Sequence, residues 1–523
     1  MSLAADLVIT GGNLITLNDR APGASALAVR RDRIEAVGTD ADIRRLVDNE
    51  TVQIDLQGKT VVPGFHDCHL HLLWLGKLLI RQVDLIGCGT IDELLSRLSE
   101  SASRTTGWIQ GHGFDQEKLR ERRFPTRDEL DRVSATRPVL ISRICGHAAV
   151  VNSAALASVS SEARGSGNES SGLYTEGAIS PFYAQIPDLD QEQLEQALLS
   201  AMRLGLRSGI TSVQTMLDSV QQLQTYTRLR KKLGRLPQRV VAMPPEAAAD
   251  VLHQHGILTG FGDEWLRIGA VKFFSDGSLG ARTALLSSPY ADDPTKTGDR
   301  VYQPEQFKHR ARSVQKMGFQ LAIHAIGDQA LRETLDAIEF ALNGEDNCVY
   351  RHRVEHASIC PRDLMKRMAK LQIATTLQPQ FVTSDTWTGE RIGESRRGWA
   401  YPFKSMIDAG IPCGLSSDSP VEKLDAFECL HSSVNRHSWS VNDRLSPMEA
   451  LKAYCLGSAY CGHREQEMGS LEVGKFADFL ILSADPFQTP SDQLRHIRPL
   501  RVFVGGKEVE SGILPGDSDK IRL

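Results

Sequence analysis

The sequence lacks the features that mark membrane, secreted and nucleic-acid-binding proteins. No apolar run approaches the roughly 18 residues of a membrane-spanning helix, and the start, MSLAADLVITGGNLITL, has no basic stretch followed by a long apolar one. Long blocks of like charge are also missing, and the formal net charge is only −5 over 523 residues. We therefore expect a cytoplasmic protein with a small-molecule substrate and with no nucleic-acid or membrane partner.

The cysteines also lack a pattern. The nine cysteines are scattered along the chain without CxxC spacing. This distribution argues against a thiolate zinc site, and an odd, dispersed set does not make a disulfide framework. We expect most of these cysteines to be buried free thiols.

Short alternating strands are concentrated at both ends of the chain. Runs such as LVITGGNLITL near the N-terminus and FADFLILS near the C-terminus are broken by glycine-rich and polar turns. Neither end has enough strands to bury an apolar face alone. We predict that residues 1–60 and 465–523 combine into one small β-sandwich.

Between these ends, apolar strand-like runs alternate with amphipathic helical stretches. About eight such runs can be counted, at residues 61–71, 209–216, 238–245, 268–277, 319–328, 350–359, 372–380 and 411–420. A repeated strand-then-helix order predicts an α/β fold with a parallel sheet. Eight repeats predict a (β/α)8 TIM barrel, which we place at residues 61–464.

One long stretch interrupts the barrel rhythm. It runs from about residue 108 to residue 195 and contains the Gly/Ser-rich segment SSEARGSGNESSG. Such composition is typical of a flexible loop. We predict that residues 108–195 form an insertion over the mouth of the barrel.

Imidazole and carboxylate groups gather in the first barrel strand, PGFHDCHLH. Alternation along a strand places Asp67, His69 and His71 on one side, so His69 and His71 can converge on one metal ion. By itself, an HxH pair is more often a pair of exposed histidines at a strand end. The same alternation turns His66 and Cys68 toward the surrounding helices, and we interpret His66 as a packed structural residue.

Other strand ends repeat this pattern. His324 in LAIHAIGD, His356 in RVEHASI and Asp418 in GLSSDSPV each end an apolar run. The carboxyl ends of barrel strands share one mouth, and imidazoles with a carboxylate suit zinc. His253 and His255 in LHQHG mimic the HxH pair, but they occupy a polar helical stretch, so we expect them at the surface.

Lys272 lies within the apolar run GAVKFFSDG. An unpaired ammonium there would be costly and its pKa would fall. One interpretation is an ion pair with Asp276 or Glu176. The other is a neutral amine that takes up carbon dioxide, giving a carbamate that bridges two metals.

The motif PGFHDCHLH resembles the PGxxDxHxH signature of the amidohydrolase superfamily. Later segments, among them GWIQGHGFDQ, VKFFSDGSLGARTALL, GLSSDSPVE and GSLEVGKFADFLIL, are similar to the branch that includes N-substituted formamide deformylase. The resemblance covers almost the whole chain and implies a metal site at the mouth of a barrel. It implies that one or two zinc ions are held by His69, His71, Lys272 as a carbamate, His324, His356 and Asp418, with Glu176 in reserve for the bridging role.

The same resemblance implies an enzyme that hydrolyses carbon–nitrogen bonds other than peptide bonds. A metal-activated water would attack an amide-type bond, and Asp418 would act as general base and then general acid. A deaminase or a lactone or phosphoester hydrolase could use the same apparatus. A non-catalytic barrel scaffold is disfavoured, because every ligand position is filled.

Three further residues are weaker candidates for substrate contacts. His147 in ICGHAAVVNS and Glu176 in GLYTEGAI fall within the insertion, and Arg397 follows Arg396 in GERIGESRRGWAYPF. For His147, and also for His112, the competing interpretation is a buried, hydrogen-bonded histidine. For Arg397, it is an arginine on a solvated loop. A homodimer is left open.

Overall fold

Eight parallel strands form the predicted (β/α)8 barrel. The computed structural model describes residues 4–21, 23–103, 107–144, 146–165, 167–436 and 442–509. The barrel strands are β8 (Phe65–Leu70), β14 (Ile210–Met216), β15 (Arg239–Met243), β17 (Val271–Phe274), β18 (Leu321–Ala325), β19 (Arg353–His356), β20 (Ala374–Leu377) and β21 (Cys413–Leu415). Each strand expected from the sequence is present, and the fold class is confirmed.

Two junctions close the barrel. The sheet β8–β14–β15 also carries the short strand β16 (Leu266–Ile268), and β17 to β21 form a second parallel sheet. A bridge between Pro245 and Lys272 joins the two sheets on one side. On the other side, the Asp418 N–H donates to the His69 carbonyl at 2.9 Å. Closure brings the carboxyl ends of the strands to one mouth.

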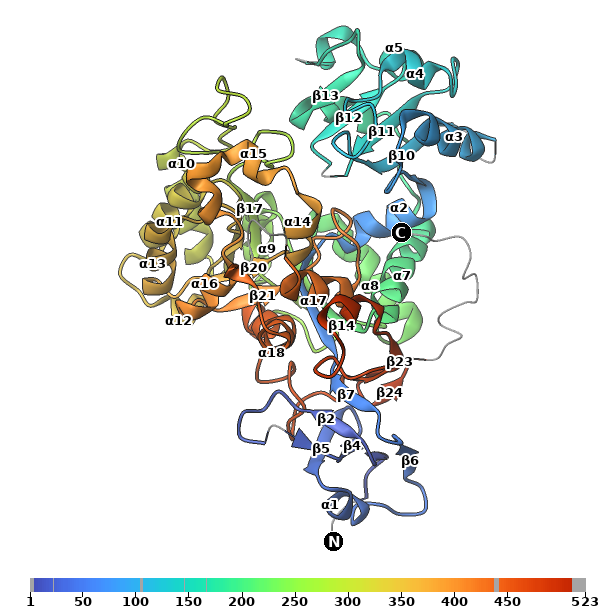
Figure 1. Cartoon of the computed structure of the whole chain (residues 1–523), viewed down its shortest axis with the longest axis vertical. Helices are drawn as coiled ribbons and strands as arrows, with labels where there is room; N and C mark the ends of the chain where they lie inside the picture. Colours follow the sequence, from blue (N-terminus) through green and yellow to red (C-terminus); the bar gives the residue numbers. More distant parts are fainter. Residues whose placement is uncertain are drawn as a thin grey trace. The chain divides into compact units, whose positions relative to one another are not determined.

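Helices connect the barrel strands (Figure 1). Those in the part of the chain that contains the barrel are α8 (Leu223–Leu233), α9 (Ala249–Gln254), α10 (Pro304–Lys316), α11 (Asp328–Leu342), α12 (Asn347–Tyr350), α13 (Arg362–Lys370), α14 (Pro379–Ser384), α15 (Thr388–Ile392), α16 (Phe403–Asp408), α17 (Ala426–Val434), α18 (Pro447–Lys452) and α19 (Ser458–Cys461). In α11, Leu331, Leu335 and Ile338 recur at helical spacing and are buried. The helix ends where Asn343 adopts a left-handed conformation.

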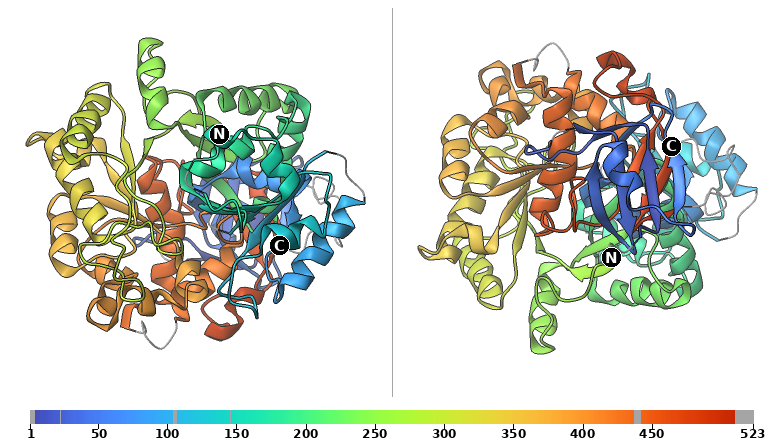
Figure 2. Two further views of the ribbon diagram at one scale, coloured as in Figure 1. Left: turned by 90° about the horizontal axis from the view of Figure 1, so that it is seen from above. Right: turned by 90° about the horizontal axis from the view of Figure 1, so that it is seen from below.

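Strands from both termini form two further sheets, which are seen from below in the right-hand view of Figure 2. One sheet has the order β5 (Arg33–Gly38), β4 (Ala26–Arg30), β1 (Leu7–Thr10) and β6 (Val52–Asp55), and α1 (Asp40–Arg44) follows β5. The other has the order β24 (Lys507–Glu508), β23 (Pro499–Val504), β22 (Phe479–Leu482), β7 (Thr60–Pro63), β2 (Asn13–Ile15) and β3 (Gly23–Ala24). The predicted β-sandwich of both termini is therefore present.

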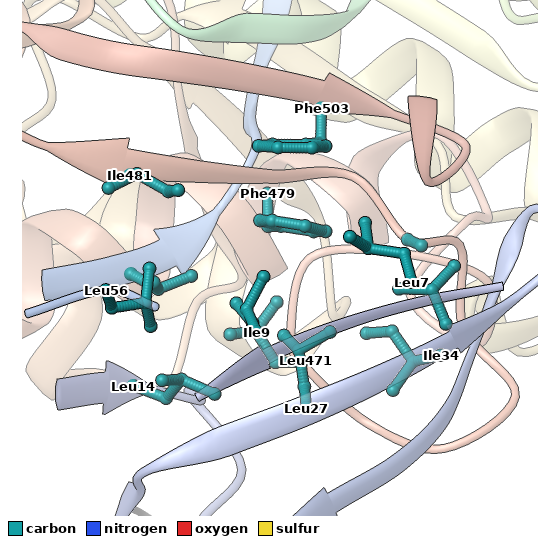
Figure 3. Packing of buried hydrophobic residues seen from close by; sticks show 13 residues of the cluster. Leu7, Ile9, Leu14, Leu27, Ile34, Leu56, Leu471, Phe479, Ile481 and Phe503 are labelled. Carbon is teal, nitrogen blue, oxygen red and sulfur yellow. The ribbon is translucent and has the colours of Figure 1, made fainter. Parts of the chain in front are cut away.

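The two sheets share one hydrophobic core (Figure 3). Phe479 of β22 and Phe503 of β23 stack with their ring centroids 4.4 Å apart, and Leu27 of β4 belongs to the same cluster. Gly64 links this sandwich to the barrel, because it joins β7 directly to β8. A Cβ atom on Gly64 would lie 2.2 Å from Thr211 Oγ1, so only glycine allows β8 to approach β14 this closely.

The described chain divides into two compact units. The first contains residues up to His71, Met202–Ser419 and those from Leu424 onward; the second contains Leu72–Ala201 and Pro420–Lys423. The predicted insertion therefore belongs to a unit that already begins directly after the HxH motif. Its position over the barrel mouth remains a prediction.

The second unit is an α/β structure with its own core. Its five-stranded sheet has the order β13 (Leu173–Thr175), β12 (Ala148–Val151), β11 (Val139–Arg143), β10 (Ile109–Phe114) and β9 (Val83–Asp84). Its helices are α2 (Leu72–Arg81), α3 (Ile91–Ala102), α4 (Arg127–Asp131), α5 (Ser153–Ala157) and α6 (Ser180–Tyr183), and α7 (Gln191–Arg207) leads back to the barrel. Leu94 and Leu98 of α3 pack against Ile109 and Ile141 of the sheet.

Two expectations from composition can be compared with this structure. In the described residues, no helix is both long enough and apolar enough to span a membrane. All eight described cysteines are free thiols, and all of these except Cys348 are buried. The expectation of buried free thiols is confirmed for these eight, whereas Cys145 lies outside the described residues.

Candidate metal centre

Four histidine side chains come together where the barrel strands end. His69 lies within β8, His71 directly follows it, and His324 and His356 belong to β18 and β19. The ring centroids of His69 and His356 are 4.8 Å apart, and those of His356 and His324 are 4.6 Å apart. The rings therefore form one continuous group although they are far apart in sequence.

A carboxylate completes this group. Asp418 Oδ1 lies 3.3 Å from His69 Nε2 and 3.5 Å from His71 Nε2. The ligand atoms of these three residues all lie within 4.8 Å of one another. In the described part of the chain, His69 Nε2 and Asp418 Oδ1 are buried without a hydrogen-bond partner. Buried polar atoms are normally paired, so the residues fit a cation bound among them.

The charge states also suit a cation. Burial lowers the pKa of His69 and holds that of His356 well below its usual range. Burial would raise the pKa of Asp418, but the neighbouring imidazoles of His69 and His71 outweigh this effect and hold the pKa of Asp418 well below its usual range. Neutral imidazole and ionised carboxylate are the forms that bind metals.

Two of these residues adopt strained backbone conformations. His356 has φ of 75° and Asp418 has φ of 54°, a region that is uncommon for residues other than glycine. Such strain persists where the surrounding structure over-determines it, and it is concentrated at functional sites. The His356 ring is fixed further by a 2.8 Å contact between Nδ1 and Gln378 Oε1, which leaves Nε2 as the nitrogen available to a metal.

Lys272 is buried beside these histidines, with 3% of its surface exposed. Burial lowers its pKa to about 8, against the opposing influence of Glu355 and Asp418. Its Nζ has no hydrogen-bond partner among the described residues. The predicted ion pair with Asp276 is wrong, because that carboxylate instead accepts three backbone N–H groups, from Leu285, Ile326 and Gly327.

Comparison with known proteins agrees with this geometry. A model of the amidohydrolase family matches residues 53–510. The chain belongs to the amidohydrolase family. Among curated proteins, it is similar to the putative amidohydrolase YtcJ of Bacillus subtilis, with 31% identity over 95% of this chain and 98% of that protein. It is also similar to N-substituted formamide deformylase of Arthrobacter pascens, with 28% identity over 97% and 98% of the two chains.

Solved structures extend the comparison. An uncharacterized metal-dependent hydrolase from Pyrococcus horikoshii has 32% identity and a TM-score of 0.79, over 93% of this chain and 99% of that one. A zinc complex of atrazine chlorohydrolase from Arthrobacter aurescens has 17% identity and a TM-score of 0.54, over 98% and 97%, and shows the shared fold alone. Family membership and the cluster of His69, His71 and Asp418 identify the amidohydrolase as a metal-dependent hydrolase.

Glu355 is a residue of this amidohydrolase that the sequence did not reveal. Its fully buried carboxylate accepts a hydrogen bond from His69 Nδ1, and it also contacts Arg353 Nε and Thr376 Oγ1, each at 2.7 Å. With its proton held on Nδ1, His69 has an Nε2 lone pair that is available to a cation beside Asp418. In the sequence, the only sign of Glu355 as a site residue was its place next to His356 in RVEHASI. Alternation along a strand predicts that these two neighbours point in opposite directions, so Glu355 was not expected at the site.

Replacing Glu355 with glutamine should weaken metal binding about 10- to 100-fold, because the neutral amide no longer orients His69 or offsets the charge of Arg353. Chelator competition against wild type measures the change. Glu333→Gln is the matched control, since Glu333 pairs with Arg300 at 2.6 Å on a helix outside the site. Equal metal affinities for the two variants would contradict the role given to Glu355.

Four other histidines of the amidohydrolase lie outside the candidate metal cluster. His66 is buried 3.1 Å from Gln214, and burial lowers its pKa to about 3. His112 is buried in the second unit, with its Nδ1 2.8 Å from Ser142 Oγ. His253 and His255 are exposed. None of these four contributes to the candidate metal cluster among the described residues.

The three weaker substrate-contact candidates fall into two places. His147 Nδ1 and Glu176 Oε2 lie 2.9 Å apart within the second unit, and both side chains are partly exposed. Arg397 pairs with Glu394 at 2.9 Å, whereas the buried Arg396 donates to backbone carbonyls, including those of Ser288 and Pro289. Contact of any of them with a substrate stays a prediction.

Proposed function

We propose that this amidohydrolase cleaves an amide-type carbon–nitrogen bond, other than a peptide bond, in a small molecule. The observation that carries the proposal is the cluster of His69, His71 and Asp418, in which the buried His69 Nε2 and Asp418 Oδ1 have no hydrogen-bond partner among the described residues. Full-length similarity to N-substituted formamide deformylase favours an amide over the amine, lactone or phosphoester substrates that the same fold can accept.

The residues at the barrel mouth suit one or two zinc ions. His69 Nε2, His71 and Asp418 would form the first set of ligands, with His324 and His356 completing the group and Lys272 as a carbamate between them. Nitrogen and oxygen donors of this kind match the borderline-soft character of zinc. A zinc ion here would supply a Lewis acid for the carbonyl oxygen and a water of lowered pKa.

Asp418 is the residue best suited to move protons. Its low pKa keeps it ionised, and its Oδ1 is free of hydrogen bonds in the described structure. It would accept the proton of the attacking water and then deliver it to the leaving nitrogen, acting as general base and afterwards as general acid. The hydrogen bond from the Asp418 backbone N–H to the His69 carbonyl fixes the backbone that carries this carboxylate.

The test combines metal analysis with a substrate screen. Protein prepared without chelator should contain zinc, and it should hydrolyse members of a panel of N-formyl, N-acyl and cyclic amides in a chelator-sensitive way. Aromatic amines, lactones and phosphotriesters form the comparison panel. If the protein hydrolyses only compounds of the comparison panel and none of the amides, the amide assignment is wrong. If the protein binds no divalent metal, the metal-dependent mechanism is wrong.

A further inference from the structure

Phe274 places an exposed aromatic ring beside the candidate metal centre. It is the last residue of β17, whose other residues, Val271 to Phe273, are buried, whereas 41% of Phe274 is exposed. Its ring centroid lies 5.3 Å from that of His324, and Lys272 Nζ lies 4.6 Å from it. One part of the ring therefore rests on two proposed metal ligands, and another part faces solvent.

The packing of β17 against the neighbouring helix does not require an aromatic side chain at Phe274. Its neighbour Phe273 supplies the apolar packing of this strand, since it is fully buried and its ring lies 6.3 Å from that of Phe307 in α10. Alternation along the strand turns Phe274 the opposite way, toward the group of histidines. A ring at a strand end of the barrel mouth is placed to meet the substrate.

A second aromatic side chain lies beside His356. Phe381 of α14 is nearly buried, and its ring lies 6.3 Å from that of His356 at an interplanar angle of 25°. Apolar rings thus adjoin both His324 and His356. Aromatic rings prefer partners that are flat and apolar, at centroid distances of about 4.5–7 Å.

We propose that Phe274 determines specificity, and that it selects amides with an aromatic group next to the scissile bond. This inference rests on the proposed amide hydrolysis and adds the class of substrate to it. The exposed part of the Phe274 ring would pack against the substrate ring, which removes apolar surface of both from water.

Two matched pairs of amides test the proposal. N-benzylacetamide with N-methylacetamide varies the leaving amine, and phenylacetamide with acetamide varies the acyl group. In zinc-loaded Phe274→Ala, kcat/KM for the aromatic member of at least one pair should fall about tenfold more than for its partner, mainly through KM. Phe274→Leu should keep part of the preference. Phe261→Ala is the matched control, since Phe261 is 56% exposed elsewhere on the chain.

Several results would overturn the inference. Equal losses for both members of each pair would mean that Phe274 only supports the strand, and an unchanged preference would mean that it does not touch substrate. If wild type hydrolyses no amide, the proposed function fails, and calorimetric titration with the same four compounds still tests Phe274. A wild-type Kd that does not favour the aromatic members, or a preference that survives in Phe274→Ala, would then refute its role.

Discussion

Replacing His69 and His71 together with alanine should leave a folded protein that binds almost no zinc. The change removes two of the three ligand atoms that lie within 4.8 Å of one another, and a coordination set of this size tolerates few losses. Several kcal/mol of transition-state stabilisation depend on the metal, so kcat/KM should fall by at least about a thousandfold. Elemental analysis of the purified variant and its kinetics measure both effects.

The chain contains a matched control for this experiment. His253 and His255 have the same HxH spacing but are exposed on and just after α9. Their double alanine variant should keep the wild-type metal content and activity. A His69/His71 variant with unchanged metal stoichiometry would show that other residues hold the metal.

Much of this architecture could be predicted because its signals are local or follow from topology. Each barrel strand is a short apolar run followed by a helical stretch, and eight of them imply a closed barrel. Closure of the barrel then predicts that His69, His324 and Asp418 lie together, and this prediction needs no knowledge of side-chain contacts. The structure places their strands in the expected parallel order.

The interactions that orient the side chains of the site could not be predicted, because they are contacts between residues that lie far apart in the sequence. Asp276 could pair with Lys272 as far as the sequence shows, but loops ending at Leu285 and Gly327 fold over its carboxylate. The link between Glu355 and His69 spans two strands that are not sequence neighbours. Alternation along a strand cannot report it, and the positive φ of His356 interrupts that alternation further.

The second unit shows another limit of sequence interpretation. Its strands β12 and β13 are only four and three residues long, AAVV and LYT, and neither has a clear alternating pattern. The Gly/Ser-rich run between them predicted a flexible loop, and the two short strands on either side of it were not recognised. Short strands paired across such a loop are recognised only once their partners are known.

Replacing Lys272 with alanine should remove at least one metal ion and lower kcat/KM at least about a hundredfold, if Lys272 carries a carbamate. Carbamate formation requires the neutral amine, and burial favours that form by lowering the pKa of Lys272 to about 8. The product is an anion, which would offset the mutual repulsion of two cations in one site. Because Nζ has no hydrogen-bond partner among the described residues, forming the carbamate breaks no existing hydrogen bond of Lys272.

Three measurements separate a carbamate from a purely structural lysine. Wild type equilibrated with ¹³C-bicarbonate and zinc should show a carbamate resonance that Lys272→Ala lacks, and short carboxylic acids should partly restore metal and activity to the variant by occupying the vacated space. Lys475→Ala is the matched control, because Lys475 is also buried but its Nζ donates to Ser470 Oγ at 2.6 Å and pairs with Glu472. That variant should keep its metal and gain nothing from added acids. If Lys272→Ala retains two metals and near-normal turnover, the buried amine is not a bridge, and Glu176 becomes the residue to test for that role.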